Sequence, residues 1–368
     1  MPDAFPQPQP KPSRWITTVE PEALIHHFLR HPPEDFEAFV SGSWLPGFRA
    51  TFDLLTTASE EMRAAFAKIP GNRWLRRWLL RRVCFMGTTV SEFCPFPKGD
   101  AEALARDMFE VWDKQSALLI VKDIPSDAPF LPEPARRLAN RMVTALEKRG
   151  CFMVDGQALA YVPVDFADEE AYLARLSAGR RRDIRRKLKR RKDLRIEIIH
   201  TGDRRLARPA FLSELYEQYL EVYAQSEIHF DLLTLEFFRA ILNDASLDGR
   251  LFLYYREEDL IGHNLCFIHD EMLIDKYVGF RYPQARAYNL YFISWMENLA
   301  FARSEGLRYY IAGWTDPAIK SYLGASFTRT RHAVYVKNAL LRLLLRPLSG
   351  HFEQDRGWRD ETPSRPEP

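Results

Sequence analysis

The chain has 368 residues, of which 46% are hydrophobic and 28% are charged, as in folded globular proteins of one or two domains. No apolar run approaches the roughly 20 residues of a membrane-spanning helix, and the N-terminus lacks the charged and then apolar pattern of a signal peptide. These features favour a cytoplasmic protein without a transmembrane segment. The four cysteines show neither a CxxC pair nor a neighbouring His cluster, so we expect no metal site and no disulfide framework.

The net charge of +2 hides an uneven distribution of charged residues. Eleven of the sixteen residues from 180 to 195 are Lys or Arg and two are Asp, which gives this segment a charge of +9 and leaves the rest at −7. Such a run is typical either of a solvated helix face or of a surface that contacts anions, such as the phosphates of tRNA or another anionic carrier. No aromatic residue interrupts the run, which argues against stacking on single-stranded bases.

The first half of the chain is predicted to be an α/β region over residues 15–164, after a proline-rich disordered leader over 1–14. Residues 21–48 and 59–82 are expected to be mainly helical. Strand patterns then alternate with amphipathic helices, and Asp155-Gly156 predicts a hairpin turn within 151–164. The expected strands are 82–96 and 116–125, and the expected helices are 100–115 and 134–150.

The second half, residues 165–348, is predicted to form a mixed, mainly antiparallel sheet flanked by helices, with a flexible tail over 349–368. A basic helix is followed by a strand, two further helices and three antiparallel strands that end at Phe280. A turn then leads to a long helix, a strand, a short helix opened by Asp316-Pro317 and a last strand. The expected segments are 168–194, 195–202, 204–228, 229–245, 249–280, 287–306, 307–314, 318–324, 329–338 and a C-terminal amphipathic helix at 339–352. Packing on the body or contact with a membrane surface would both suit that last helix.

The stretch from Tyr277 to Phe327 carries the chemistry. A strand ending in Val278-Gly279-Phe280 leads through a turn into a helix N-terminus, where free N–H groups favour a phosphate. Arg281 and Arg286 flank this turn and suit a pyrophosphate. Ala318, Tyr322, Gly324 and Phe327 follow at fixed spacing on and after the short helix.

This arrangement resembles the GNAT N-acyltransferases, and more narrowly the BioF2-like acetyltransferase group, which is related to the FemA/FemB/FemX peptidyltransferases. The resemblance covers about 165–336 and implies a GNAT-like fold, with the first half as a degenerate second unit of a tandem pair. It implies acyl-CoA, typically acetyl-CoA, as donor and a small-molecule or peptide amine as acceptor. The implied donor contacts are Val278, Gly279, Phe280, Arg281, Arg286, Ala287, Tyr288 and Asn289. The turn lacks the glycines of the usual GNAT motif, as in Fem-like proteins that use aminoacyl-tRNA.

The resemblance also implies that Tyr322 protonates the leaving group. Candidates for the base that deprotonates the amine are His263, His229 and Asp275, and we expect His263 and Asp275 to approach each other across paired strands. Polar or aromatic residues near the same strand ends are expected to bind substrate, namely Asp231, Asn264, Lys276, Trp314 and Lys320. Three functions remain open: acyl-CoA-dependent N-acylation, Fem-like transfer from aminoacyl-tRNA, and ligand binding without catalysis.

Overall fold

A computed structural model describes residues 13–53, 68, 80–112, 116–226, 230–338 and 342. The predicted leader, helix 59–82, His229, the C-terminal helix and the tail fall wholly or mainly outside these residues. Among the described helices, none is both long and apolar enough to cross a bilayer.

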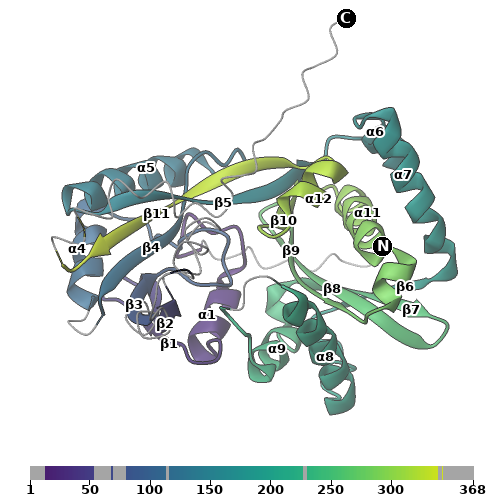
Figure 1. The fold of residues 1–368 in the computed structure, drawn as a ribbon, viewed down its shortest axis with the longest axis horizontal. Helices are drawn as coiled ribbons and strands as arrows, with labels where there is room; N and C mark the ends of the chain where they lie inside the picture. The colour runs from purple at the N-terminus through teal and green to yellow at the C-terminus, as the bar shows by residue number, and fades with distance from the viewer. Residues whose placement is uncertain are drawn as a thin grey trace, which may run out of the picture.

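One eleven-stranded sheet, in the order β1-β2-β3-β4-β11-β5-β10-β9-β8-β7-β6, forms the centre of the protein (Figure 1). This is the expected mixed, mainly antiparallel GNAT-like sheet with helices on both faces. Its strands in chain order are β1 Glu37–Val40, β2 Pro46–Asp53, β3 Leu80–Met86, β4 Leu118–Pro125, β5 Phe152–Pro163, β6 Arg195–His200, β7 Gly249–Arg256, β8 Asp259–His269, β9 Met272–Phe280, β10 Tyr309–Gly313 and β11 Ser326–Val336.

The helices agree with the expected periodic segments, apart from shorter ends and three breaks. They are α1 Glu22–Arg30, α4 Ala101–Val111, α5 Glu133–Lys148, α6 Glu169–Ala174, α7 Ala178–Leu188, η1 Lys189–Asp193, α8 Pro209–Gln225, α9 Leu235–Leu242, η2 Ala245–Leu247, α10 Gln284–Tyr288, α11 Leu290–Ser304 and α12 Pro317–Leu323. The basic helix breaks where the Ser177 side chain accepts from the Arg180 N–H and caps a new helix, and it ends in the 3₁₀ turn η1. Gly150 lies just past α5 with φ +86°, as expected of a residue that ends a helix.

Two predictions in the first half are wrong. Residues 33–48 were expected to be helical but form β1 and the start of β2, because pairing of β2 with both β1 and β3 outweighs local helix preference. Residues 151–164 form the single strand β5 and not a hairpin. Gly156 lies inside this strand, where a Cβ atom would overlap the Thr330 side chain of β11, so its glycine reflects close strand packing and not a turn.

The sheet contains the same local order twice. In the first half β2 pairs antiparallel with β3, and β3 pairs parallel with β4; in the second half β8, β9 and β10 repeat this order. Each half also places its last strand beside the other half, since β5 pairs with β10 and β11 pairs with β4. The two strands meet at the centre, where β11 pairs with β5, so the halves share one continuous sheet.

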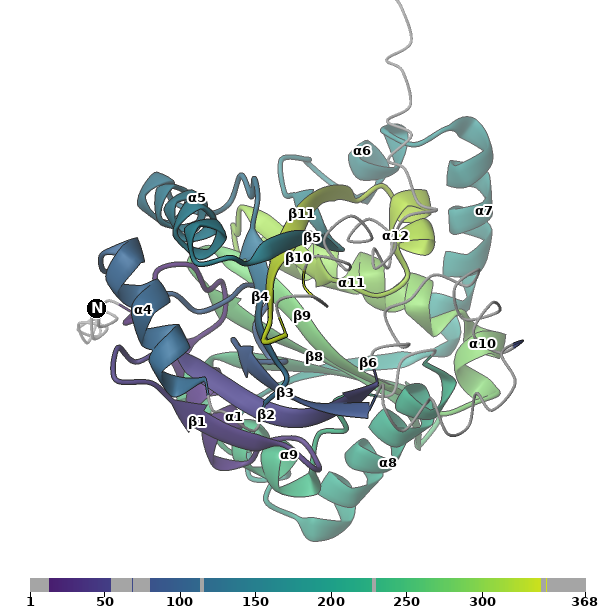
Figure 2. The same ribbon diagram turned by 60° about the vertical axis from the view of Figure 1, so that its left-hand side comes forward.

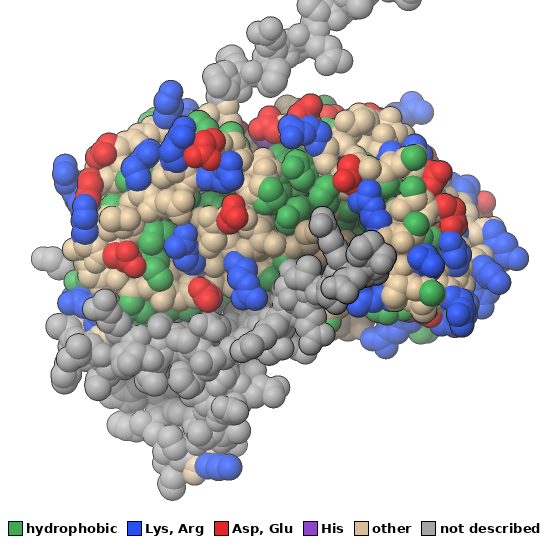
Figure 3. All heavy atoms as spheres, turned by 90° about the horizontal axis from the view of Figure 1, so that it is seen from above, with side chains coloured by type: hydrophobic (Ala, Val, Ile, Leu, Met, Phe, Trp, Pro, Cys, Tyr) green, Lys and Arg blue, Asp and Glu red, His purple; other side chains and the backbone are tan. Residues whose placement is uncertain are grey.

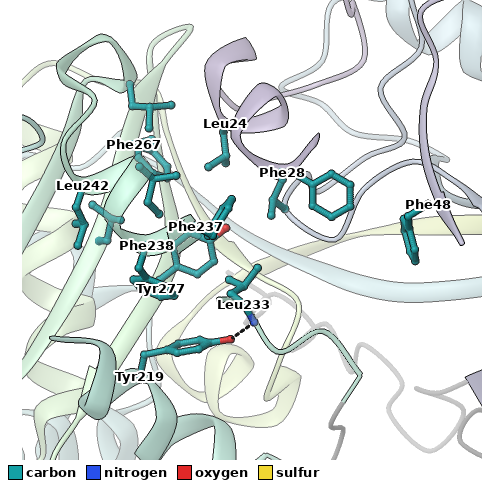
Figure 4. Packing of buried hydrophobic residues seen from close by; sticks show 14 of the residues in the cluster. Leu24, Phe28, Phe48, Tyr219, Leu233, Phe237, Phe238, Leu242, Phe267 and Tyr277 are labelled. Carbon is teal, nitrogen blue, oxygen red and sulfur yellow. Dashed lines mark hydrogen bonds between the residues drawn. The ribbon is translucent and has the colours of Figure 1, made fainter. Parts of the chain in front are cut away.

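The hydrophobic core joins the two halves on one face of the sheet. Side chains of α1 and β2, including Leu24, Phe28 and Phe48, belong to the same buried cluster as Phe237 and Phe238 of α9 (Figure 4). On the opposite face, α4 and α5 cover the first half, and α6, α7 and α11 cover the second (Figures 1 and 2). Each large side chain buried in this way stabilises the fold by about 1.5–3 kcal/mol, which holds the strand ends at the junction in place.

Candidate functional site

Strands β9 and β10 separate near the junction of the halves. Their parallel pairing covers only three positions, from Met272–Tyr309 to Ile274–Ile311, after which β9 continues to Phe280 with β8 as its paired neighbour. We call this point, bounded by Asp275 and Lys276 on β9 and by Ala312 and Gly313 on β10, the strand fork. A fork between two parallel strands exposes backbone and side chains at the centre of a sheet.

A β-bulge turns the side chains at the fork. The β8–β9 register shifts between Leu265, which faces Tyr277, and Cys266, which faces Asp275, so Lys276 is the extra residue. Because a bulge redirects the strand, Asp275 and Tyr277 face opposite sides of the sheet although they are two residues apart. Asp275 contacts α11, and Tyr277 contacts the aromatic rings of α9.

Asp275 is the centre of a polar network at the fork. Its Oδ2 accepts hydrogen bonds from Tyr310 Oη at 2.7 Å, Asn298 Nδ2 at 3.1 Å and Asn264 Nδ2 at 3.2 Å. Burial raises the pKa of Asp275, and these bonds and the charge of Lys320 oppose the rise. The residue as a whole is partly exposed, and the raised pKa predisposes its carboxylate to accept a proton.

Lys320 enters the same region from α12. It is 4% exposed, and burial lowers its pKa to about 8, although Asp275, Glu92 and Asp316 favour its charged form. Its Nζ lies near Gly313 on β10. An ammonium with this pKa can both stabilise a negative oxygen and donate a proton near neutral pH.

A buried ion triad ties the fork to the first half. Lys276 Nζ lies 3.2 Å from Glu20 Oε1 and 2.7 Å from Glu92 Oε1, and the Glu92 N–H donates to Glu20 Oε1 at 2.6 Å. Burial alone would lower the pKa of Lys276, but the two glutamates outweigh it and raise the pKa to about 12. Lys276 is therefore a permanent cation, in contrast to Lys320.

Asp231 adds a second carboxylate from the loop between α8 and α9. It is partly exposed, and burial raises its pKa to about 6, although the charges of Lys122 and Lys276 oppose the rise. Of the predicted substrate residues, Asn264 donates a hydrogen bond to the predicted base Asp275, and the charge of Lys320 acts on the same carboxylate. Lys276 bonds instead to Glu20 and Glu92, and the charge of Asp231 acts on Tyr277. The fifth, Trp314, lies at the end of β10 and packs edge-on against Phe93 at 6.3 Å.

The expected approach of His263 to Asp275 is wrong. His263 pairs with Gly279 and points to the other face of the sheet, where its Nδ1 lies 3.0 Å from Gln218 Oε1 of α8. Burial lowers its pKa to about 3, so it is neutral. The bulge lies between these two positions and shifts the register, so simple strand alternation misled the prediction.

Tyr322 also lies apart from the fork. Its hydroxyl donates to Asp183 Oδ2 of α7 at 2.9 Å, and its ring faces Phe292. The neighbouring Lys320 points to the fork from the same short helix. His229, the remaining candidate base, falls outside the described residues.

The turn that follows Phe280, which was predicted to bind a phosphate, bonds to side chains of α8. Arg281 pairs with Glu214 at 3.0 Å, the Tyr282 N–H donates to Glu221 Oε2 at 2.9 Å, and Arg286 donates to Gln225 Oε1 at 2.6 Å. Val278, Gly279 and Phe280 pair with β8. The turn was expected to lead straight into the long helix. Instead Ala287 and Tyr288 belong to α10, and Asn289, with φ +55°, separates α10 from α11. In this arrangement Glu214 and Glu221 already bond to the Arg281 side chain and the Tyr282 N–H, two groups of the turn that was expected to bind a pyrophosphate.

The corresponding fork of the first half is filled by its own chain. After the last β3–β4 pair, Met86–Val121, the loop that follows β3 crosses the opening, and the Cys94 N–H donates to Asp123 O at 2.9 Å. Lys122 Nζ donates to Thr88 O of the same loop at 2.8 Å. The fork of the second half is therefore the better candidate site.

Several residues at the strand fork were not predicted from the sequence. Glu20 and Glu92 lie far from Lys276 in the chain, and no spacing rule links them. Asn298 had a signal, since it is a fully buried amide on the mainly apolar inner face of α11, four residues after buried Ser294. Within the described residues, no group of three or more His, Cys, Asp or Glu side chains is arranged to hold a metal.

Comparison with known proteins supports the fold and the family. The model of the FemAB-like family, described as peptidoglycan biosynthesis/recognition, matches residues 137–338. Among solved structures, FemX is 12% identical with a TM-score of 0.50, covering 88% of this chain and 98% of FemX. L-PGS from Bacillus licheniformis is also 12% identical (TM-score 0.49, covering 90% and 98%), and a tandem GNAT protein of clavulanic acid biosynthesis is 13% identical (0.42, covering 86% and 88%). No curated protein matches this chain.

Proposed function

The chain belongs to the FemAB-like family, and on this premise we propose that it transfers an acyl or aminoacyl group from an activated ester or thioester to an amine. The observation that carries the proposal is the pair of Asp275 and Lys320 at the strand fork. There the carboxylate of Asp275 has a raised pKa, and the buried ammonium of Lys320, which interacts with its charge, has a pKa of about 8.

The two groups suit the two proton transfers of the reaction. The amine forms a C–N bond with the acyl carbon, and Asp275 or Asp231 takes the proton that the amine loses. Lys320 stabilises the negative charge that develops on the carbonyl oxygen and gives a proton to the leaving oxygen or sulfur when its bond to carbon breaks. Lys276, paired with Glu20 and Glu92, holds the first half of the sheet against the fork. Lys320 takes the acid role that the resemblance assigned to Tyr322.

The family description favours an acceptor amine on a peptidoglycan peptide. Acetyl-CoA remains a candidate donor, and it would require the turn at Arg281–Arg286 to release its contacts with Glu214, Glu221 and Gln225. An aminoacyl ester carried by RNA contains no pyrophosphate, so it does not require this turn to release those contacts. The contacts of α8 therefore favour a donor of the second kind.

We also propose that the predicted division into regions 15–164 and 165–348 reflects two GNAT-like units, of which the second carries the reaction. The repeated order of β2-β3-β4 and β8-β9-β10 supports this division, as does the filled fork of the first half.

A transfer assay tests the proposed function. The purified protein is incubated with a muropeptide that has a free amine and with acetyl-CoA or an aminoacylated RNA, and the mass of the peptide is followed. We expect transfer, a loss of at least about a hundredfold in Asp275→Asn and Lys320→Met, and little change in Tyr322→Phe. If Tyr322→Phe were inactive while Asp275→Asn and Lys320→Met remained active, the assignment of Asp275 and Lys320 to the proton transfers would be wrong. Absence of transfer with every donor and acceptor would favour a binding protein.

A further inference from the structure

The polar network of Asp275 continues beneath α11. Asn298 donates from its Nδ2 atom both to Asp275 Oδ2 and to Tyr310 Oη, each at 3.1 Å. Its other polar atom, Oδ1, is buried and has no hydrogen-bond partner among the described residues. A buried amide oxygen of this kind lowers stability unless water bonds to it. The network therefore has an open end on the face of the sheet that α11 covers.

Tyr254 of β7 provides a second open end beneath the same helix. It is fully buried in the apolar cluster that joins β7 to α11, and its hydroxyl has no partner in the part of the chain that the structure describes. Burial raises the pKa of Tyr254, and the charges of Glu297 and Asp275 raise it further. The hydroxyl therefore stays neutral, and it is within electrostatic reach of the carboxylate at the fork and of a second one on α11.

Glu297 brings this line of polar groups to the surface. It is partly exposed, and its Oε1 lies 2.9 Å from Arg191 Nε of η1, which also pairs with Glu169 of α6 at 2.8 Å. Burial raises the pKa of Glu297, while Arg191 opposes the rise and Glu169 adds to it. Lys and Arg side chains crowd the right-hand end of the molecule in Figure 3, where Figure 1 places α6 and α7, and η1 follows directly after α7. A proton that Glu297 releases therefore leaves beside cations, which disfavour its return.

We propose that these groups of Asn298, Tyr254 and Glu297, joined by ordered water, relay a proton from the strand fork to solvent. The inference rests on the proposed function, in which Asp275 takes one proton from the amine in each turnover. A donor and an acceptor that meet at the fork cover the exposed side of Asp275, so this proton needs a second way out.

The relay moves one proton and breaks no bond between heavy atoms. The Asp275 carboxyl gives its proton to water that is bonded to Asn298 Oδ1. The Tyr254 oxygen accepts a proton from this water and releases its own, which the Glu297 carboxylate takes up. Glu297 then loses the proton to solvent, so both carboxylates return to their ionised forms. Asn298, Tyr254 and Glu297 are positioning residues, since none of them touches the substrate.

Tyr254→Phe separates a relay from a structural role. It removes only a hydroxyl without a partner among the described residues, so a purely structural Tyr254 predicts an unchanged rate and an unchanged or higher stability. The relay predicts a loss of about tenfold in kcat with KM unchanged, and Glu297→Gln should have the same effect. The matched controls are Tyr255→Phe, on the other face of the sheet, and Glu305→Gln, exposed at the end of α11, which should both transfer like wild type.

A small buffer supplies a readout that a structural defect would not change. Imidazole carries protons to and from a site whose relay is cut. The kcat of Tyr254→Phe and of Glu297→Gln should therefore rise with imidazole concentration at constant pH, whereas the wild type should not respond. A high-resolution crystal structure of the wild type should in addition show ordered water bonded to Tyr254 Oη and Asn298 Oδ1.

The outcomes separate this inference from the proposed function. Wild-type kcat in both variants, or a loss of kcat that imidazole does not restore, would overturn the relay and leave the proposed function standing. A crystal structure without water at the two atoms would do the same. A wild type that transfers no group would overturn the proposed function and the relay with it. A loss of kcat that imidazole restores, with water at both atoms, would support both.

Discussion

Replacing Lys320 by Met should make the protein more stable and inactive at the same time. Met is close to Lys in length and carries no charge, so the variant fills the same space without a buried ammonium. The pKa of Lys320 falls from 10.5 to about 8 on folding. At about 1.4 kcal/mol for each unit, the charged form costs the folded state about 3 kcal/mol at neutral pH. The attraction of Asp275 is already part of this shift, so we expect a net stabilisation of about 2–3 kcal/mol at pH 7.

The dependence on pH provides the sharper test. Because the folded pKa lies below the unfolded one, the unfolded chain holds a proton between about pH 8 and pH 10.5 that the folded protein has lost. The stability of the wild type therefore rises with pH in this window, whereas Lys320→Met lacks this contribution. The advantage of the variant over the wild type should shrink by about 2 kcal/mol between pH 7 and pH 9.5.

Urea unfolding at both pH values measures this difference, and the transfer assay measures the loss of activity. Lys98→Met, an exposed lysine on the loop before α4, is the matched control and should leave the free energy of unfolding within about 0.5 kcal/mol of the wild type. A difference between wild type and Lys320→Met that stays constant with pH would refute the reasoning. So would a strongly destabilised variant, because Lys320 would then be paired in the fold and not strained by burial.

Three further substitutions test the surroundings of the fork. Asp231→Asn should be more stable than wild type above about pH 6. The raised pKa of Asp231 means that ionisation lowers the stability of the wild type as the pH rises from 3.8 to about 6. If Asp231 is the base, kcat/KM of the wild type should rise near pH 6 and the variant should lose this rise; an unchanged profile would exclude Asp231 as the base. His263→Ala should lower the free energy of unfolding by about 1–3 kcal/mol, because Gln218 Oε1 loses its contact with His263 Nδ1. The variant should retain the transfer rate within about twofold, and a large fall in kcat would restore His263 as a catalytic residue. Gly279→Ala would place a Cβ atom in the His263 ring and should cost about 1–3 kcal/mol in urea unfolding. This cost should largely disappear in a His263→Ala background, and additive effects would mean that the two residues do not meet.

Much of the fold could be predicted because its long elements have strong local patterns. The amphipathic helices α5 and α8 and the antiparallel strands β7–β9 were expected close to their observed bounds. The errors fall where pairing outweighs local preference. Asp155-Gly156 is a strong turn signal, but this part of β5 pairs with β11, where Asp155 faces Arg331, and the pairing keeps the dipeptide within the strand.

The site was predictable only in part, for a different reason. Asp275, Lys276 and Asn264 could be noticed because charged or amide residues interrupt apolar strands. Their directions could not be predicted, because one extra residue at the bulge decides which face each side chain takes. Glu20 and Glu92 carried no signal at all, since only the shared sheet brings residues this far apart in the chain to Lys276.

The charged groups at the junction of the halves lower the stability of the fold. Lys320, Asp231 and Asp275 each have a pKa shifted toward the neutral form by burial, so each lowers stability near neutral pH. Apolar residues of the same size would give a more stable fold, which is why Lys320→Met is expected to raise the free energy of unfolding. The first half shows the alternative, because its own loop fills the corresponding fork. The fold closes one fork and keeps at the other titratable groups whose burial is only partly compensated. Packing gives no reason for this loss of stability, whereas proton transfer in an acylation reaction does.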